Sequence, residues 1–205
     1  MKLFIHPLSP NARKPRLVAR ALGLALDEQI VDFAKGEHRS PAYLAQNPNG
    51  MVPTLVDGDL VLWESHAIAR YLCGVAGDNA LYPAELRARA DIDRWLDWTL
   101  AHFGPACSTL AHERLLKPMW GQPTDPAQVA SGEAAFRRYG AVLDAHLEQH
   151  LWLAGAIPTL ADYMVAAHLG SAVAAQYPWE SFEHLRAWFG RMVETEAWIA
   201  TAPQR

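Results

Sequence analysis

Residues 36–65 read GEHRSPAYLAQNPNGMVPTLVDGDLVLWES, and this stretch decides how the chain folds. Its centre, Asn-Pro-Asn-Gly at 47–50, is a dense turn signal. The two short apolar segments that follow, 54–56 and 60–63, are separated by Asp-Gly-Asp, which predicts a tight antiparallel hairpin. We expect a helix directly after this hairpin, over residues 65–72.

The residues before this stretch supply further elements. Residues 3–5 are apolar and predict a short buried strand. Apolar residues then recur at near-helical spacing, which predicts a helix that begins near residues 11–12 and stops at Gly23. A second strand is expected over 27–32 and a short helix over 41–46. The expected order is therefore strand, helix, strand, short helix, two strands, helix.

The pattern changes after residue 75. Residues 76–85 include Gly, Asn and Pro, which break the helical pattern, and we interpret them as a linker. Apolar side chains beyond it fall on helical faces, and no strand-like alternation competes with them. Thr159 and Asp162 have the spacing of a helix capping box. The sequence thus predicts an α/β domain over residues 1–75 followed by an all-α domain over residues 86–205.

Composition and charge exclude several classes of function. The chain has 205 residues, with 18 Lys and Arg against 22 Asp and Glu, so a nucleic-acid partner is not expected. Cys73 and Cys107 lie far apart and belong to no Cys/His cluster, which argues against a disulfide scaffold or a zinc site. His146 and His150 are four residues apart on one helix, but no third metal ligand accompanies them. We therefore expect no metal.

The hydrophobic segments are short. The N-terminal apolar run is too short for a signal peptide, and nowhere do 18 apolar residues follow one another. These observations lead us to expect a soluble, cytoplasmic protein without a membrane partner.

Three motifs carry a resemblance to a known family: GEHRSP at 36–41, NPNGMVPTL at 47–55 and DGDLVLWES at 57–65. They are similar to the signature of the cytosolic glutathione S-transferases, and the chain resembles the phi and theta-like bacterial branches most. The resemblance implies a thioredoxin-like domain followed by a C-terminal helical bundle. It also implies glutathione as co-substrate with no bound cofactor, a role in detoxification, and a homodimer.

The resemblance assigns residues to two parts of glutathione. Val52 and Pro53 would form a cis-prolyl turn, and the backbone of Val52 would pair with the cysteinyl part like an added strand. Glu64 would bind the γ-glutamyl ammonium, while Ser65 and its N–H would bind the γ-glutamyl carboxylate at a helix N-terminus. Without the resemblance, Pro53 is an ordinary loop proline and Ser65 an N-cap.

The glycyl end is assigned in the same way. His38 would contact the glycyl carboxylate, with Arg39 adding positive charge nearby. Taken singly, His38 is an exposed loop histidine. The plant phi pattern carries Gln where this chain has Met51, so a polar contact is lost there. Either the glycyl end is held more loosely, or the second substrate differs from the usual ones of that branch.

Ser9 lies between the first strand and the first helix. A thiolate beside it would meet a hydroxyl donor and the positive end of the helix, and both lower the thiol pKa from its reference value of about 8.5. Asn11 is the rival donor, and Ser9 as a simple helix cap is the structural alternative. We favour Ser9 because an O–H donor to a thiolate is charge-assisted and can rotate to suit.

The second substrate is expected in an apolar cleft between the two domains. Its predicted lining is Leu8, Pro10, His102 and Trp120. The predicted function is a glutathione transferase that joins the glutathione thiolate to small hydrophobic electrophiles. The alternatives are a glutathione-dependent peroxidase, isomerase or dehalogenase, and a non-catalytic interaction protein of the same fold. Ser9 in place of a cysteine argues against disulfide exchange.

Overall fold

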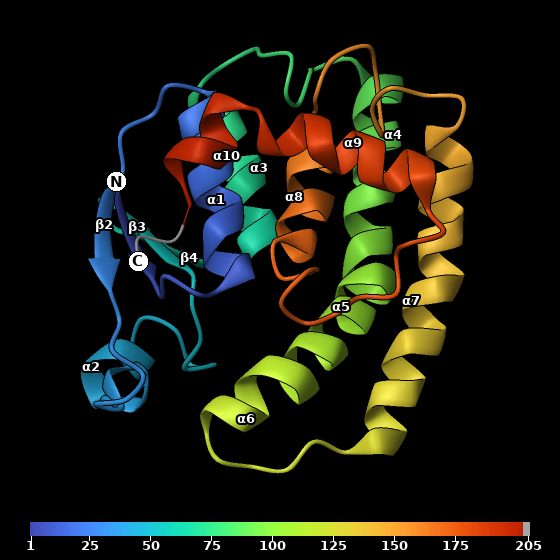
Figure 1. Ribbon diagram of the computed structural model, residues 1–205. Coiled ribbons are helices and arrows are strands. Elements are labelled where there is room, and N and C mark those ends of the chain that lie inside the picture. Colours follow the sequence, from blue (N-terminus) through green and yellow to red (C-terminus); the bar gives the residue numbers. More distant parts are fainter. Residues whose placement is uncertain (203–205) are drawn as a thin grey trace. The chain divides into compact units, whose positions relative to one another are not determined.

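The computed structural model describes residues 1–202, and the last three positions of the expected helical domain lie outside this range. The chain divides into two compact units (Figure 1). The first unit is Met1–Pro83 together with the C-terminal segment from Glu194, and the second is Ala84–Val193. The expected α/β plus all-α fold class, with a thioredoxin-like sheet and a helical bundle, is confirmed.

A four-stranded mixed sheet forms the centre of the first unit. Its strands are β1 (Lys2–Ile5), β2 (Asp27–Ile30), β3 (Thr54–Asp57) and β4 (Leu60–Trp63), in the order β2-β1-β3-β4. β1 pairs in parallel with β2 and antiparallel with β3, and β3 and β4 form the expected hairpin. Leu3 of β1 lies opposite Leu55 of β3, and both side chains are fully buried.

Helices cover this sheet. The first unit contains α1 (Pro10–Ala21), a 3-10 turn (Glu37–Arg39), α2 (Pro41–Leu44), α3 (Ser65–Val75) and α10 (Glu196–Ala200). α1 and α3 pack side by side, as Figure 1 shows, and bury apolar faces that include Leu17 and Ile68. α1 begins at Pro10, slightly earlier than expected. Proline is favourable there because the first helical N–H has no intrahelical partner to lose.

The C-terminal segment belongs to the first unit because it binds α1. The Arg13 guanidinium donates to the carbonyl of Trp198 at 2.8 Å and to Thr201 Oγ1 at 3.3 Å. The same guanidinium lies 3.8 Å from the centroid of the Trp198 ring. This grouping differs from the expected division, which assigned every residue after the linker to the helical domain.

The second unit, residues 84–193, is helical. Its helices are α4 (Leu86–Trp98), α5 (Gly104–Ala111), α6 (Lys117–Met119), α7 (Pro126–Leu147), α8 (Leu160–Leu169) and α9 (Glu183–Val193). π-helical turns at Thr99–Phe103 and His112–Leu116 join α4 to α5 and α5 to α6. Pro105 and Pro118 follow these turns, and a proline inside a helix removes a backbone hydrogen bond that the wider turn accommodates.

The predicted capping box is present at the start of α8. Oδ2 of Asp162 accepts hydrogen bonds from the backbone N–H of Thr159 at 2.8 Å and from its hydroxyl at 3.0 Å. Oδ1 accepts from the N–H of Leu153 and from the indole of Trp188, both at 2.9 Å. Burial raises the pKa of Asp162, and the four donors oppose this rise. The carboxylate therefore ties three segments of the helical unit together.

Within residues 1–202, no helix is both long and apolar enough to cross a membrane. The same residues contain no group of three or more His, Cys, Asp or Glu side chains placed to hold a metal ion.

Candidate active site

One edge of the sheet gathers the residues that the motifs single out. Phe4 lies opposite Thr54, and Thr54 lies opposite Trp63, so the end of β1, the start of β3 and the end of β4 meet there. β2 runs parallel to β1 and ends at the same edge. Loops that leave this edge therefore converge, although the ends of β1 and β4, at Ile5 and Trp63, lie far apart in the chain.

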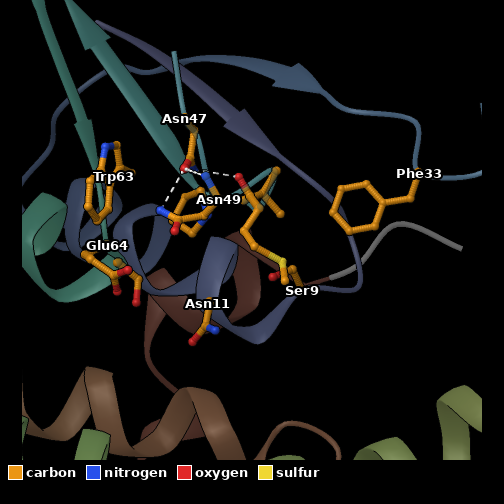
Figure 2. Close-up of a pocket in the computed structure, with 11 residues that line it drawn as sticks. Ser9, Asn11, Phe33, Asn47, Asn49, Trp63 and Glu64 are labelled. Atoms are coloured by element: carbon orange, nitrogen blue, oxygen red, sulfur yellow. Dashed lines mark hydrogen bonds between the residues drawn. The ribbon is translucent and has the colours of Figure 1, made fainter. Parts of the chain in front are cut away.

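These loops enclose a pocket of about 470 Å³ in the first unit (Figure 2), a volume typical of small-molecule sites. Its lining is Ser9, Asn11, Phe33, Asn47, Asn49, Met51, Val52, Pro53, Trp63, Glu64 and Ser65. Seven of the predicted site residues thus line one cavity: Ser9, Asn11, Met51, Val52, Pro53, Glu64 and Ser65.

The Val52–Pro53 peptide bond is cis, as the resemblance implies. The side chain of Val52 is buried, while that of Met51 is 62% exposed. The neighbouring carbonyl of Met51 accepts hydrogen bonds from the Tyr43 hydroxyl at 2.6 Å and from Asn47 Nδ2 at 2.9 Å. Two side chains thus fix the backbone immediately before the cis bond.

A buried polar network surrounds this turn. Thr54 Oγ1 lies 3.0 Å from both the Tyr43 hydroxyl and Asn47 Nδ2. Oδ1 of Asn47 accepts from the backbone and the side chain of Asn49 at 3.1 Å, and Figure 2 shows the side-chain bond. Burial raises the pKa of Tyr43, so its hydroxyl stays protonated and available as a donor. The network therefore holds the backbone of the turn through side-chain hydrogen bonds.

The β4–α3 junction presents a helix N-terminus to the pocket. Glu64 is the N-cap residue of α3, and its backbone has φ 74°, in the left-handed region that glutamate rarely adopts. Its side chain makes no capping hydrogen bond. Ser65 is the first helical residue and is buried, so the interpretation of Ser65 as the N-cap is wrong. The first N–H groups of α3 have no intrahelical acceptor and favour an anion.

The first turn of α1 contributes two polar side chains. The Ser9 hydroxyl oxygen accepts a hydrogen bond from the N–H of Ala12 at 3.2 Å, so Ser9 is an N-cap. An accepting hydroxyl keeps its own hydrogen, and Ser9 can therefore also donate into the pocket. Asn11 Oδ1 accepts from the ammonium of Lys14 at 3.0 Å. Both rival thiolate donors lie on the same cavity.

His38 and Arg39 do not line the pocket. The His38 ring packs against Phe33 in a tilted arrangement with 4.3 Å between ring centroids, and His6 packs against the same phenyl ring at 4.8 Å. His38 Nδ1 is buried and has no hydrogen-bond partner among residues 1–202. His38 thus contacts Phe33, which lines the cavity, while Arg39 is exposed.

The four residues predicted for the second-substrate pocket are divided between the two units. Leu8 is 57% exposed and Pro10 begins α1, and neither lines the pocket of the first unit. His102 stacks on Tyr139 at 5.1 Å, and Trp120 is 59% exposed. Their common cleft stays a prediction.

Four lining residues carried no predicted role, namely Phe33, Asn47, Asn49 and Trp63. The sequence motifs include three of them, but a loop asparagine reads as a turn former and a strand tryptophan as core. Phe33 lies three residues after β2 in a loop without a distinctive pattern. Only the topology of the sheet indicates that Phe33 lies at the pocket, because β2 ends at the same sheet edge as β1.

Comparisons with known proteins agree with this geometry. The family model for the "Glutathione S-transferase, N-terminal domain" matches residues 1–74, and that for the "Glutathione S-transferase, C-terminal domain" matches residues 126–191. A probable glutathione S-transferase of Oryza sativa subsp. japonica is 34% identical over 92% of this chain and 89% of its own length. Glutathione S-transferase 3 of Zea mays is 38% identical over 79% of this chain and 73% of its own.

Solved structures give the same result. Glutathione transferase F2 from Populus trichocarpa superposes with a TM-score of 0.92 at 27% identity, covering 98% of this chain and 96% of that chain. The theta class glutathione S-transferase from Xanthomonas axonopodis pv. citri, solved with glutathione bound, has a TM-score of 0.88 at 33% identity. The match covers 100% of this chain and 97% of that chain. The chain therefore belongs to the glutathione S-transferase family.

Proposed function

We propose that this protein is a glutathione transferase that joins the glutathione thiolate to small hydrophobic electrophiles. One observation carries the proposal: a single pocket is lined by the first turn of α1, the start of α3 and the backbone before a cis-proline. Helix N-termini attract anions and an exposed backbone segment can pair with a peptide, which suits a charged tripeptide. Membership of the family supports the same activity.

In this proposal, glutathione is bound along the pocket as co-substrate. The backbone N–H and C=O of Val52 pair with the cysteinyl residue, as in an added strand. The γ-glutamyl carboxylate binds Ser65 and the free N–H groups of α3, while its ammonium binds the Glu64 carboxylate. The left-handed backbone of Glu64 supports this role, because residues in such conformations are frequently found at functional sites.

The glycyl end of glutathione is expected to find fewer polar partners than the γ-glutamyl end. We keep His38 and Arg39 as the proposed contacts of the glycyl carboxylate, although neither lines the pocket and His38 packs against Phe33. Met51 lines the pocket with an apolar, largely exposed side chain, so it adds no hydrogen bond there. We therefore expect the glycyl end to contribute less affinity than the γ-glutamyl end.

Catalysis consists of holding the thiol as a thiolate beside an electrophile. The Ser9 hydroxyl is the proposed main donor to sulfur, and the Asn11 amide is the second. On binding, the thiol proton is released to water. The thiolate electron pair then forms a carbon–sulfur bond, and the leaving group, such as a halide, departs with its own bonding pair. No residue needs to form a covalent intermediate.

The electrophile and the assembly are also proposals. Leu8, Pro10, His102 and Trp120 remain the proposed lining of the electrophile pocket. The exposure of Leu8 and Trp120 supports them, since apolar ligands need accessible apolar surface. We further propose a homodimer in the cytoplasm, which the family resemblance supports; sedimentation of the purified protein tests the dimer.

A conjugation assay with glutathione and a generic aryl halide tests the proposed function. We expect turnover that depends on both substrates and falls at least tenfold in Ser9→Ala, an increase of about 1.4 kcal/mol in the barrier. Turnover in Ser9→Ala equal to that of wild type would assign the donor role to Asn11. Failure to bind millimolar glutathione would instead favour the interaction-protein alternative.

A further inference from the structure

Trp63 lines the active-site pocket and has no part in the binding of glutathione as proposed above. It is the last residue of β4, and 39% of its surface is exposed. A large aromatic side chain that is partly exposed in a cavity offers its ring to a ligand, because that surface is not used in the packed core.

The pairing of the strands places Trp63 on the face of the sheet that borders the pocket. Trp63 lies opposite Thr54, and Thr54 lies opposite Phe4, so the three side chains point to the same face. Phe4 packs edge-on against Tyr43 of α2 with 5.8 Å between ring centroids, and Thr54 bonds with the Tyr43 hydroxyl. β4 is the outer strand of the sheet, so the indole lies at the end of this row.

Glu64 follows Trp63 and lines the same cavity. Successive side chains of a strand point to opposite faces, so a strand that continued through residue 64 would separate the two. The left-handed backbone of Glu64, with φ 74°, ends this alternation. Figure 2 shows Trp63 and Glu64 on one side of the pocket and Phe33 on the opposite side.

The charge of the pocket favours a cation on this side. Among residues 1–202, Glu64 is the only charged residue that lines the pocket. An ammonium has three N–H donors, and a carboxylate beside it accepts from one or two of them. The face of a tryptophan ring attracts a cation more strongly than that of tyrosine or phenylalanine. A carboxylate and an indole on the same side of a pocket therefore suit a primary ammonium.

We propose that Trp63 is a specificity-determining residue, whose indole face binds the γ-glutamyl ammonium of glutathione next to the Glu64 carboxylate. This inference rests on the proposed glutathione site and adds to it a residue that recognises the amino group. The ring attracts a cation and gains nothing from a ligand without one. The site therefore selects thiol peptides with a free, protonated amino group.

The test compares the affinities of wild type and Trp63→Leu for two thiol peptides by calorimetric titration. One is glutathione, and the other is glutaryl-cysteinyl-glycine, which lacks only the amino group. At about pH 6.5 an α-amino group is mostly protonated. Loss of packing in Trp63→Leu affects both peptides, so the ratio of the two affinities is the diagnostic quantity. We expect the preference for glutathione to fall about fivefold, which corresponds to about 1 kcal/mol.

Two further variants sharpen this comparison. Phe33→Leu is the matched control, because it removes the aromatic ring on the opposite side of the same pocket. It should change the affinity for both peptides by the same factor and keep the wild-type ratio. Trp63→Phe keeps a ring with a weaker attraction for cations, so its ratio should lie between those of wild type and Trp63→Leu.

The outcomes separate this inference from the proposed function. A folded Trp63→Leu variant with the wild-type ratio would overturn the inference and leave the glutathione site intact. Equal affinity of wild type for both peptides would overturn the inference and the ammonium role of Glu64, but not the conjugation reaction. Wild type that binds no glutathione would overturn the proposed function as well. Should Trp63→Leu fail to fold, Trp63→Phe decides, and a ratio equal to that of wild type would contradict the inference.

Discussion

Stability below neutral pH should depend on His66. Its ring is 2% exposed, neither nitrogen has a hydrogen-bond partner among residues 1–202, and its folded pKa is lowered to about 2. The unfolded chain has the ordinary histidine pKa of about 6.5 and therefore binds more protons than the folded chain below that value. Stability is thus fully present above pH 6.5 and falls as the pH decreases through it.

The size of this loss follows from proton linkage. At about pH 5.5 the unfolded imidazole is roughly ten times more often charged than neutral, which lowers the free energy of unfolding by about 1.4 kcal/mol, and at about pH 4.5 by about 2.7 kcal/mol. Carboxylates titrate in the same range, so the quantity to use is the difference between wild type and His66→Leu, where their contributions cancel.

Urea unfolding of both proteins at neutral and mildly acidic pH measures this difference. His66→Leu changes packing by an amount that does not depend on pH, so only the pH dependence is diagnostic. We expect wild type to lose about 1.4 kcal/mol more than the variant between about pH 7.5 and 5.5. A difference that stays constant with pH would refute the reasoning, because it would mean that His66 can be protonated in the folded state.

Four further predictions concern the site and the scaffold. Ser9→Ala should lower turnover with an aryl halide at least tenfold, an effect of about 1.4 kcal/mol, while calorimetry finds glutathione affinity nearly unchanged. Met51→Gln should tighten glutathione binding about tenfold at most, because one hydrogen bond contributes about 0.5–1.5 kcal/mol. Asp162→Ala should cost about 3 kcal/mol or more in urea unfolding, because buried donors lose their acceptor. Arg13→Ala should cost about 2 kcal/mol and speed hydrogen exchange in α10, because the guanidinium bonds and stacks there.

Each of these four has a contradicting result. Ser9→Ala that abolishes binding would assign Ser9 to affinity and not to the thiolate. Unchanged affinity in Met51→Gln would show that the glycyl end does not reach residue 51. Asp162→Ala within 1 kcal/mol of wild type would mean that water replaces the carboxylate. Unaltered exchange in α10 after Arg13→Ala would show that apolar packing alone holds the C-terminal segment.

Local signals in the sequence were sufficient for much of the first unit. The Asp-Gly-Asp turn defines the β3–β4 hairpin, because few other structures fit two short apolar segments at that spacing. The capping box at Thr159 is likewise a short-range pattern. Such features depend on residues within a few positions of one another, and these can be interpreted without the fold.

Long-range contacts account for what was missed. Arg13 bonds with Trp198, 185 positions away, so no local pattern could group the C-terminal segment with the first unit. Phe33 enters the pocket only because β2 pairs in parallel with β1. Lys14 is expected at the surface from its residue type, and its burial arises only when the chain folds.

Calorimetric titration with glutathione, followed by the thiolate absorbance of the complex near neutral pH, tests the central claim most directly. The account predicts saturable binding and a bound thiol whose pKa lies below the reference value of about 8.5. No binding at millimolar glutathione, or binding with an unchanged thiol pKa, would contradict it.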